Sequence, residues 1–147
     1  MDNRTRAQEW QRLAEMDLSS AEYLLNMRPV PVEIICYHCQ QSAEKYLKGY
    51  LVLYGINPPK IHDLNELCKL CSDLSDTFKE IADQCSDLTA YGVQPRYPME
   101  LMLEERDIWQ VLSSAKAIRN FILSFAPEIM PKEQEQNESS SQDGPSL

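Results

Sequence analysis

The sequence predicts an all-α fold, an up-and-down bundle of four to five helices with a disordered C-terminal tail. Apolar residues recur at the spacing of amphipathic helices as far as Phe125. From Pro131 onward this periodicity is lost, and Glu, Gln, Ser and Asn dominate the composition. We therefore expect one helical domain over residues 1–130 and a disordered acidic and polar tail over residues 131–147.

Proline and glycine residues divide the periodic part into helices. The first helix is expected at about Arg4–Met27, before the two prolines of "RPVPVE", and the second at about Glu33–Tyr54. Gly55 in "GINPPK" is a C-terminal cap for the second helix. The third helix begins after Asp63, which with Glu66 three residues later forms a capping-box pattern.

Two further amphipathic segments complete the bundle. One spans about Asp76–Leu88, and the last helix is expected over about Met99–Phe125. Between them, the glycine and prolines of "TAYGVQPRYP" predict a loop.

The composition fits a single acidic domain. The chain has 147 residues, 43% of them hydrophobic, and a formal net charge of -9. Such a surface repels a phosphate backbone, which disfavours generic nucleic-acid binding. No apolar run has the length of a membrane span, and the N-terminal residues are too polar for a signal peptide, so we expect a cytoplasmic protein without membrane contact.

Five cysteines raise the question of a metal site. Cys36 and Cys39, like Cys68 and Cys71, have the C-x-x-C spacing of zinc ligands. Each pair, however, continues an apolar row at helical spacing instead of lying on a tight turn. We interpret the cysteines as reduced core residues and predict no metal site.

Asp17 interrupts the apolar face of the first helix. One interpretation is that its carboxylate lies at the margin of the helix contact and reaches water. The alternative is a partly buried acid paired with Lys45, Lys48 or Arg119, because an unpaired buried carboxylate is costly.

A polar stripe runs along the second helix. Tyr37, Gln41, Glu44 and Lys48 are spaced four, three and four residues apart and therefore share one ridge. The stripe is either a solvated face with an ordinary Glu44–Lys48 surface pair or one wall of a binding site.

Three residues elsewhere favour the binding-site interpretation. His62, Arg96 and Tyr97 lie at junctions between loops and helices, where a bundle could gather them at one end. A cation, an imidazole and an aromatic ring suit the phosphate and base of a nucleotide such as ATP or GTP. We expect the phosphates to meet Lys48 and Arg96, and one of the tyrosine rings to stack on the base. His38, the other histidine, flanks the stripe and is interpreted as a structural or surface residue.

The order of these motifs resembles the HEPN domain (higher eukaryote and prokaryote nucleotide-binding domain). The resemblance rests on "CYHCQQSAEKYLKGYLVLYG", then "IHDLNEL", then "RYP" before a long final helix, and on the Asp of "AEMDLSSAEYLL". It implies a helical bundle that forms a homodimer. It also implies a small prokaryotic protein encoded beside a minimal nucleotidyltransferase partner, as in a toxin-antitoxin pair.

Many HEPN proteins are ribonucleases that carry Arg, four to six residues, then His near the last helix. Here Arg119 lies in that helix, but Ser124, Phe125 and Ala126 stand where the His would be. We therefore expect a non-catalytic subunit that binds a nucleotide, the nucleotidyltransferase, or both. The alternatives are a divergent ribonuclease that uses His62 and Arg96, and a purely structural helical dimer.

Overall fold

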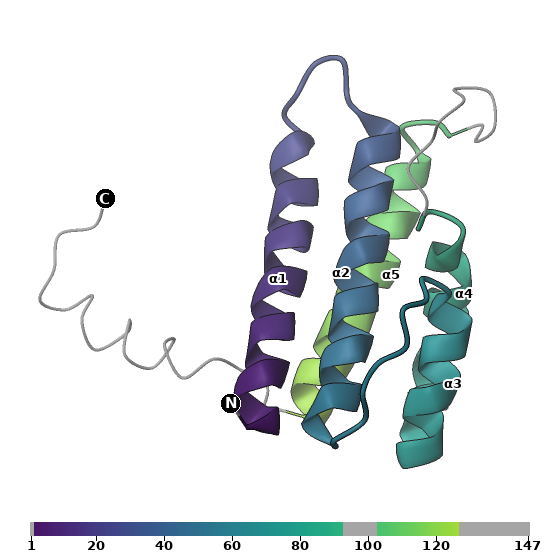
Figure 1. The fold of residues 1–147 in the computed structure, drawn as a ribbon. Coiled ribbons are helices and arrows are strands. Elements are labelled where there is room, and N and C mark those ends of the chain that lie inside the picture. Colours follow the sequence, from purple (N-terminus) through teal and green to yellow (C-terminus); the bar gives the residue numbers. More distant parts are fainter. Residues whose placement is uncertain (1, 93–102, 127–147) are drawn as a thin grey trace, which may run out of the picture.

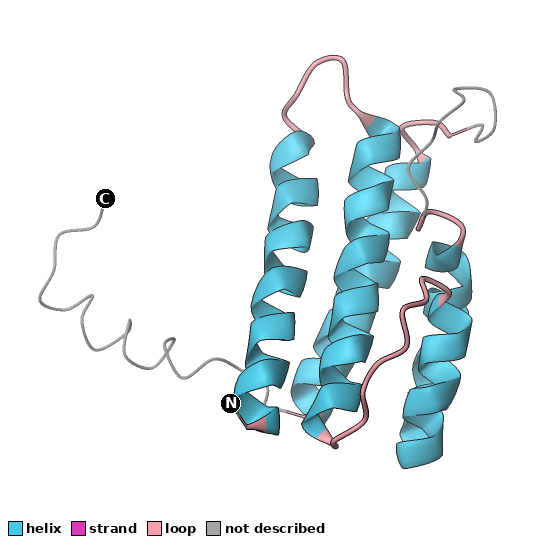
Figure 2. Cartoon of the chain, in the orientation of Figure 1, coloured by secondary structure: helices cyan, strands magenta, loops and turns pink. Residues whose placement is uncertain are grey.

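The computed structural model describes residues 2–92 and 103–126, and within them every regular element is helical (Figures 1 and 2). The elements are α1 (Asn3–Leu24), α2 (Val32–Leu53), α3 (Leu64–Leu74), the 3-10 helix η1 (Asp76–Ile81), α4 (Ala82–Thr89) and α5 (Asp107–Phe125). The predicted all-α bundle is confirmed. The predicted tail from Pro131 and the "RYP" loop lie outside the described residues.

Most helix ends follow the signals in the sequence. The Asp2 side chain accepts a hydrogen bond from the backbone N–H of Thr5 and caps α1. At the other end of α1, N–H groups of residues 25–27 bond to carbonyls three residues back. The first helix therefore ends in 3-10 turns, so α1 stops at Leu24 and not at Met27.

The caps of α2 and α3 match the prediction. Gly55 has a φ of 79°, and the N–H of Ile56 bonds to the carbonyl of Leu51, which together close α2 in a Schellman motif. Asp63 caps α3 by accepting from the N–H groups of Asn65 and Glu66.

The last helix is shorter than predicted. It begins at Asp107, and the residues just before it are not helical: 105 and 106 form a turn, and 103 and 104 have no regular structure. The Asp107 carboxylate accepts a 2.8 Å hydrogen bond from the Glu104 N–H, which closes the first turn at this point. Met99 and Leu101 lie outside the described residues.

Helix α2 lies at the centre of the bundle. It packs against α1 on one side, α5 on another, and α3 and α4 on a third (Figure 1). The loop over residues 54–63 returns along the bundle, so α3 runs in the same direction as α2. The core residues with the largest fully buried side chains include Tyr46, Tyr50, Phe78, Ile118 and Ile122.

One glycine determines how closely α1 approaches α2. A Cβ on Gly49 would lie 3.1 Å from the Cβ of Trp10, closer than ordinary van der Waals contact. The missing side chain at Gly49 therefore lets the indole of Trp10 rest on α2, beside Lys48.

Candidate functional site: a buried polar cluster on α2

The charged half of the polar stripe on α2 is buried. Side-chain exposure is only 5% for Glu44 and 8% for Lys48, and Glu44 Oε2 lies 3.1 Å from Lys48 Nζ. The ammonium group also lies 6.0 Å from the centre of the Trp10 ring. The interpretation of this pair as an ordinary solvated surface pair is therefore wrong, because α1 and the loop before α3 cover it.

Three donors besides Lys48 surround the Glu44 carboxylate. Glu44 Oε1 lies 3.0 Å from His62 Nδ1, 3.4 Å from Gln40 Nε2 and 3.5 Å from Gln41 Nε2. Gln40 also donates to the backbone carbonyl of His62 at 2.9 Å, and Gln41 donates to Gln40 Oε1 at 2.8 Å. We call these five residues, Gln40, Gln41, Glu44, Lys48 and His62, the Glu44 cluster.

His62 is the exposed edge of the Glu44 cluster. Its side chain is 64% exposed, although its Nδ1 contacts a carboxylate that is almost fully buried. A carboxylate only accepts hydrogen bonds, so Nδ1 carries the proton and Nε2 is left for solvent or a ligand. The arrangement holds one imidazole in a fixed orientation at the surface.

The other predicted nucleotide-binding residues are placed differently. Tyr37 is half-buried, and its ring contacts that of His38 at 6.1 Å between centroids, edge to face. Arg96 and Tyr97 lie outside the described residues. The described segment before them ends at Gly92, where an added Cβ would lie 2.8 Å from Gln40 Nε2, so this chain segment passes directly over the Glu44 cluster.

Asp17 forms a second charged group between α1 and α2. Its side chain is 13% exposed, and it forms an ion pair with Lys45 and a 2.9 Å contact with His38 Nδ1. Arg119, the other predicted partner, instead donates to Asn120 at 3.1 Å, and Lys48 bonds to Glu44. Sequence reasoning missed His38 as a partner, although its seven-residue spacing from Lys45 places both on one helix face.

A neighbouring interaction was also missed. Tyr46 is fully buried and donates its hydroxyl to the Glu15 carboxylate. Burial, and then this hydrogen bond, raise the pKa of the Tyr46 phenol well above its ordinary value. No feature of the sequence distinguishes this tyrosine from the apolar core residues around it.

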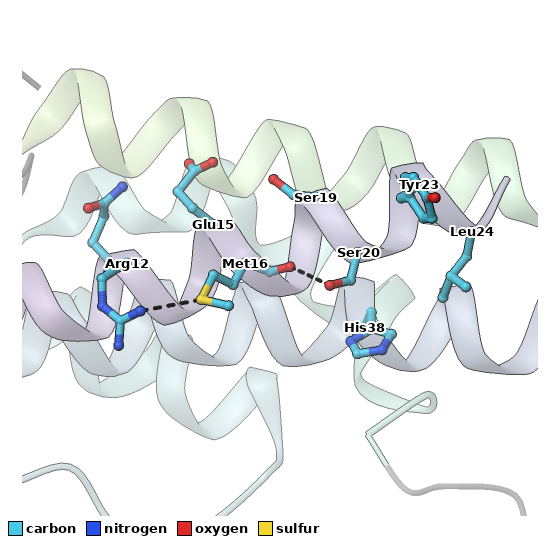
Figure 3. Close-up of a pocket in the computed structure, with 9 residues that line it drawn as sticks. Arg12, Glu15, Met16, Ser19, Ser20, Tyr23, Leu24 and His38 are labelled. Atoms are coloured by element: carbon cyan, nitrogen blue, oxygen red, sulfur yellow. Dashed lines mark hydrogen bonds between the residues drawn. The ribbon is translucent and has the colours of Figure 1, made fainter. Parts of the chain in front are cut away.

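The surface of α1 beside these groups is hollowed. A groove of about 760 Å³ runs along the helix, where Arg12 donates to Met16 Sδ and Ser20 donates to the Met16 carbonyl (Figure 3). His38 lies at the same groove, next to Ser20 in the view of Figure 3. The groove mixes both charges with apolar side chains.

All five cysteines are free and buried, as the helical spacing predicts. The part of the chain that the structure describes contains no group of three or more His, Cys, Asp or Glu side chains that could hold a metal ion. Nor does it contain a helix with the length and apolar character required to cross a bilayer.

A model of the HEPN domain matches residues 7–126, which cover all the described helices except the first turn of α1. The chain belongs to the HEPN family. The match includes the Glu44 cluster, the ion pair of Asp17 with Lys45, and the whole of the predicted resemblance. No curated protein and no solved structure matches the chain.

Proposed function

We propose that this HEPN protein is a non-catalytic subunit that binds a nucleotide at the Glu44 cluster and works with a partner nucleotidyltransferase. The observation that supports this is the exposed imidazole of His62 held by a buried acid. Next to it, the half-buried Gln41 side chain supports the edge of the cluster through its bonds to Gln40 and Glu44. In the proposed complex the His62 ring is protonated on both nitrogens and donates through Nε2 to the phosphate oxygens of the nucleotide.

In this proposal Lys48 has a positioning role. Its ammonium is already paired with Glu44 and is buried, so it holds the carboxylate that orients His62. The phosphates would meet His62 and Arg96, which follows Gly92 by four residues. This changes the expectation that Lys48 contacts phosphate directly.

The absence of the ribonuclease motif supports a non-catalytic role. Arg119 on α5 has Ser124, Phe125 and Ala126 at the positions where a histidine would complete the motif. Both histidines of the chain lie elsewhere, each with its Nδ1 on a carboxylate. General acid-base chemistry at Arg119 therefore has no histidine in the same helix.

Calorimetric titration with ATP and GTP tests the proposal, with the protein alone and with the nucleotidyltransferase encoded beside it. Charge-assisted contacts are worth roughly 1.5–3 kcal/mol, so His62→Ala and Arg96→Ala should each weaken binding about tenfold or more. His38→Ala is the matched control, because His38 is also held by a carboxylate but lies at the α1–α2 interface. Absence of binding in both conditions, or equal weakening by His38→Ala, would contradict the proposal.

One observation favours a second candidate, a divergent ribonuclease. The Glu44–His62 pair leaves Nε2 exposed, an arrangement suited to a general base that takes the proton of the RNA 2′-hydroxyl while the 2′-oxygen attacks the adjacent phosphorus and the 5′-oxygen leaves. Incubation of RNA with purified protein and a chelator would then give cleavage that His62→Ala abolishes and His38→Ala does not. Cleavage that survives His62→Ala would rule this candidate out.

The expected homodimer is also a proposal, and exposed apolar side chains support it. Tyr23, Met27, Ile34 and Trp109 are 49–78% exposed, and they lie at the end of the bundle where α1 ends and α2 and α5 begin. A second copy would bury them. Light scattering of full-length protein should give twice the chain mass, and a change of Tyr23 and Trp109 to Ser should give the monomer.

A further inference from the structure

Helices α3 and α4 are antiparallel and have a fixed register. The backbone N–H of Leu64 donates to Thr89 Oγ1 at 3.0 Å, and Thr89 Oγ1 also donates to the N-cap side chain of Asp63 at 3.3 Å. One helical turn further along α3 is Cys68, and one turn back along α4 is Cys85. The same register therefore brings these two cysteines together, and their thiols are hydrogen-bonded to each other.

Cys68 is the cysteine that small solutes reach. It is 5% exposed, whereas the other four cysteines have no exposed surface. It lines a surface depression of about 500 Å³ whose rim carries two lysines and two aspartates, Lys69, Lys79, Asp73 and Asp76. Cys85 lies behind Cys68, away from solvent.

The protonation of the two thiols is unequal. The Cys85 thiol donates to the Cys68 sulfur, and this lowers the pKa of Cys68 to about 7, while the pKa of Cys85 is raised. Burial raises the pKa of Cys36 and Cys39 to about 12 and also raises that of Cys71. The Cys68 thiol also donates to the Phe78 carbonyl at 3.5 Å and gives up this bond when it ionises. Cys68 is nevertheless the thiol whose pKa is lowered, which favours the nucleophilic thiolate form at this sulfur over the other four.

We propose that Cys68 is an oxidation site for a small peroxide and that Cys85 is its resolving thiol, so that oxidation joins α3 to α4 by a reversible disulfide. The site has three parts in contact: a solute-accessible sulfur, a depression that admits the oxidant, and a second thiol held against the first by the helix register.

The reaction is balanced with hydrogen peroxide as the oxidant. The Cys68 sulfur attacks one oxygen, the O–O bond breaks, an S–O bond forms, and the departing hydroxide takes a proton to become water. The Cys85 thiol then loses its proton, and its sulfur attacks Cys68. The S–O bond breaks, the S–S bond forms, and a second water leaves, so two thiols are oxidised and one peroxide is reduced.

The disulfide would close a loop that contains the end of α3, all of η1 and the start of α4. Such a link restricts the unfolded chain, so the oxidised protein should unfold at a temperature several degrees above that of the reduced protein. The reduced form, with all five thiols free as in the structure, is the reference state for this comparison.

Peptide mapping of the full-length wild-type protein tests the site directly. The reduced, folded protein is treated with one equivalent of hydrogen peroxide, its remaining thiols are blocked in denaturant, and it is digested with trypsin. Cleavage after Lys60, Lys69, Lys79 and Arg96 places Cys68, Cys71 and Cys85 on three different peptides. The expected result is one linked pair, residues 61–69 joined to residues 80–96, which a reductant separates.

Two variants distinguish the roles of the thiols. Cys85→Ser should leave Cys68 as a sulfenic acid that dimedone traps, whereas Cys71→Ser, the matched core control, should form the same disulfide as wild type. The proposal would be overturned if the folded wild-type protein kept all its thiols, or if Cys36, Cys39 or Cys71 were oxidised as fast as Cys68. The wild-type map gives this answer even if a variant does not fold.

Discussion

Replacement of Lys48 by Met is the sharpest test of the Glu44 cluster. Methionine keeps most of the side-chain stem that packs beside Trp10 and removes only the ammonium group. The Glu44 carboxylate then remains buried, with 5% of its side chain exposed, and its partners among residues 2–92 and 103–126 are His62, Gln40 and Gln41. The substitution therefore isolates the contribution of one buried charge.

The expected loss in the free energy of unfolding follows from the burial of the Glu44–Lys48 pair. Removal of one partner from a buried ion pair costs about 3–5 kcal/mol, whereas an exposed pair four residues apart in a helix contributes about 0.3–0.5 kcal/mol. Because three donors remain on Glu44, we expect Lys48→Met to cost an amount at the lower end of the range for buried pairs, roughly 3 kcal/mol. Glu44→Gln should cost a similar amount, because it leaves the Lys48 ammonium buried without its counter-charge.

Urea unfolding followed by circular dichroism at pH 7 measures the effect. With a typical slope for a domain of this size, a loss of roughly 3 kcal/mol lowers the midpoint by about 1–2 M urea. The double variant Glu44→Gln/Lys48→Met removes both charges and should be more stable than either single variant. A cost below about 0.5 kcal/mol for Lys48→Met, or additive costs in the double variant, would refute the account of a buried pair.

Four further outcomes follow from the structure. Gly55→Ala should destabilise the protein by about 1 kcal/mol in the same urea assay, because Gly55 has a φ of 79° while the added Cβ meets nothing closer than 3.4 Å. Burial raises the pKa of Cys36 and Cys39 from 9.0 to about 12, so the unfolded chain releases these protons first; the contribution of these two thiols to stability should be constant below about pH 9 and be lost as the pH rises towards 12, and Cys36→Ala should show a smaller loss over that range. A chain that ends at Pro131 should keep the thermal midpoint and oligomeric state of the full chain; a loss of several degrees would count against a dispensable tail. Elemental analysis of protein purified without chelator should find no stoichiometric zinc, since stoichiometric metal would contradict the core role of the cysteines.

Periodicity and caps allowed most of the fold to be predicted from the sequence. Gly55 and Asp63 act locally, through one dihedral angle and one side chain, and the structure uses both as expected. The predicted start of the last helix was wrong because Met99 and Leu101 extend the apolar pattern of the sequence. The observed start depends instead on the hydrogen bond between the Asp107 side chain and the Glu104 N–H. A pattern of apolar residues contains no information about such a polar contact.

The candidate site could be predicted only in part. Helical spacing showed that Gln41, Glu44 and Lys48 share a ridge, but spacing within one helix does not reveal what covers that ridge. The cover comes from Trp10 on another helix and from the loop that carries His62, and these contacts depend on how the elements pack. The contact between Cys68 and Cys85 was missed for the same reason, because it arises from the register of α3 against α4.

The close approach of Trp10 to α2 at Gly49 gives the molecule an internal optical probe. The chain has two tryptophans, and the other, Trp109, is 67% exposed on α5. Because the emission of an indole depends on its surroundings, replacement of Trp109 by Phe would leave a spectrum from Trp10 alone. That spectrum would report on the charge of Lys48 and on any displacement of α1, so a change at the Glu44 cluster could be followed in real time without a label.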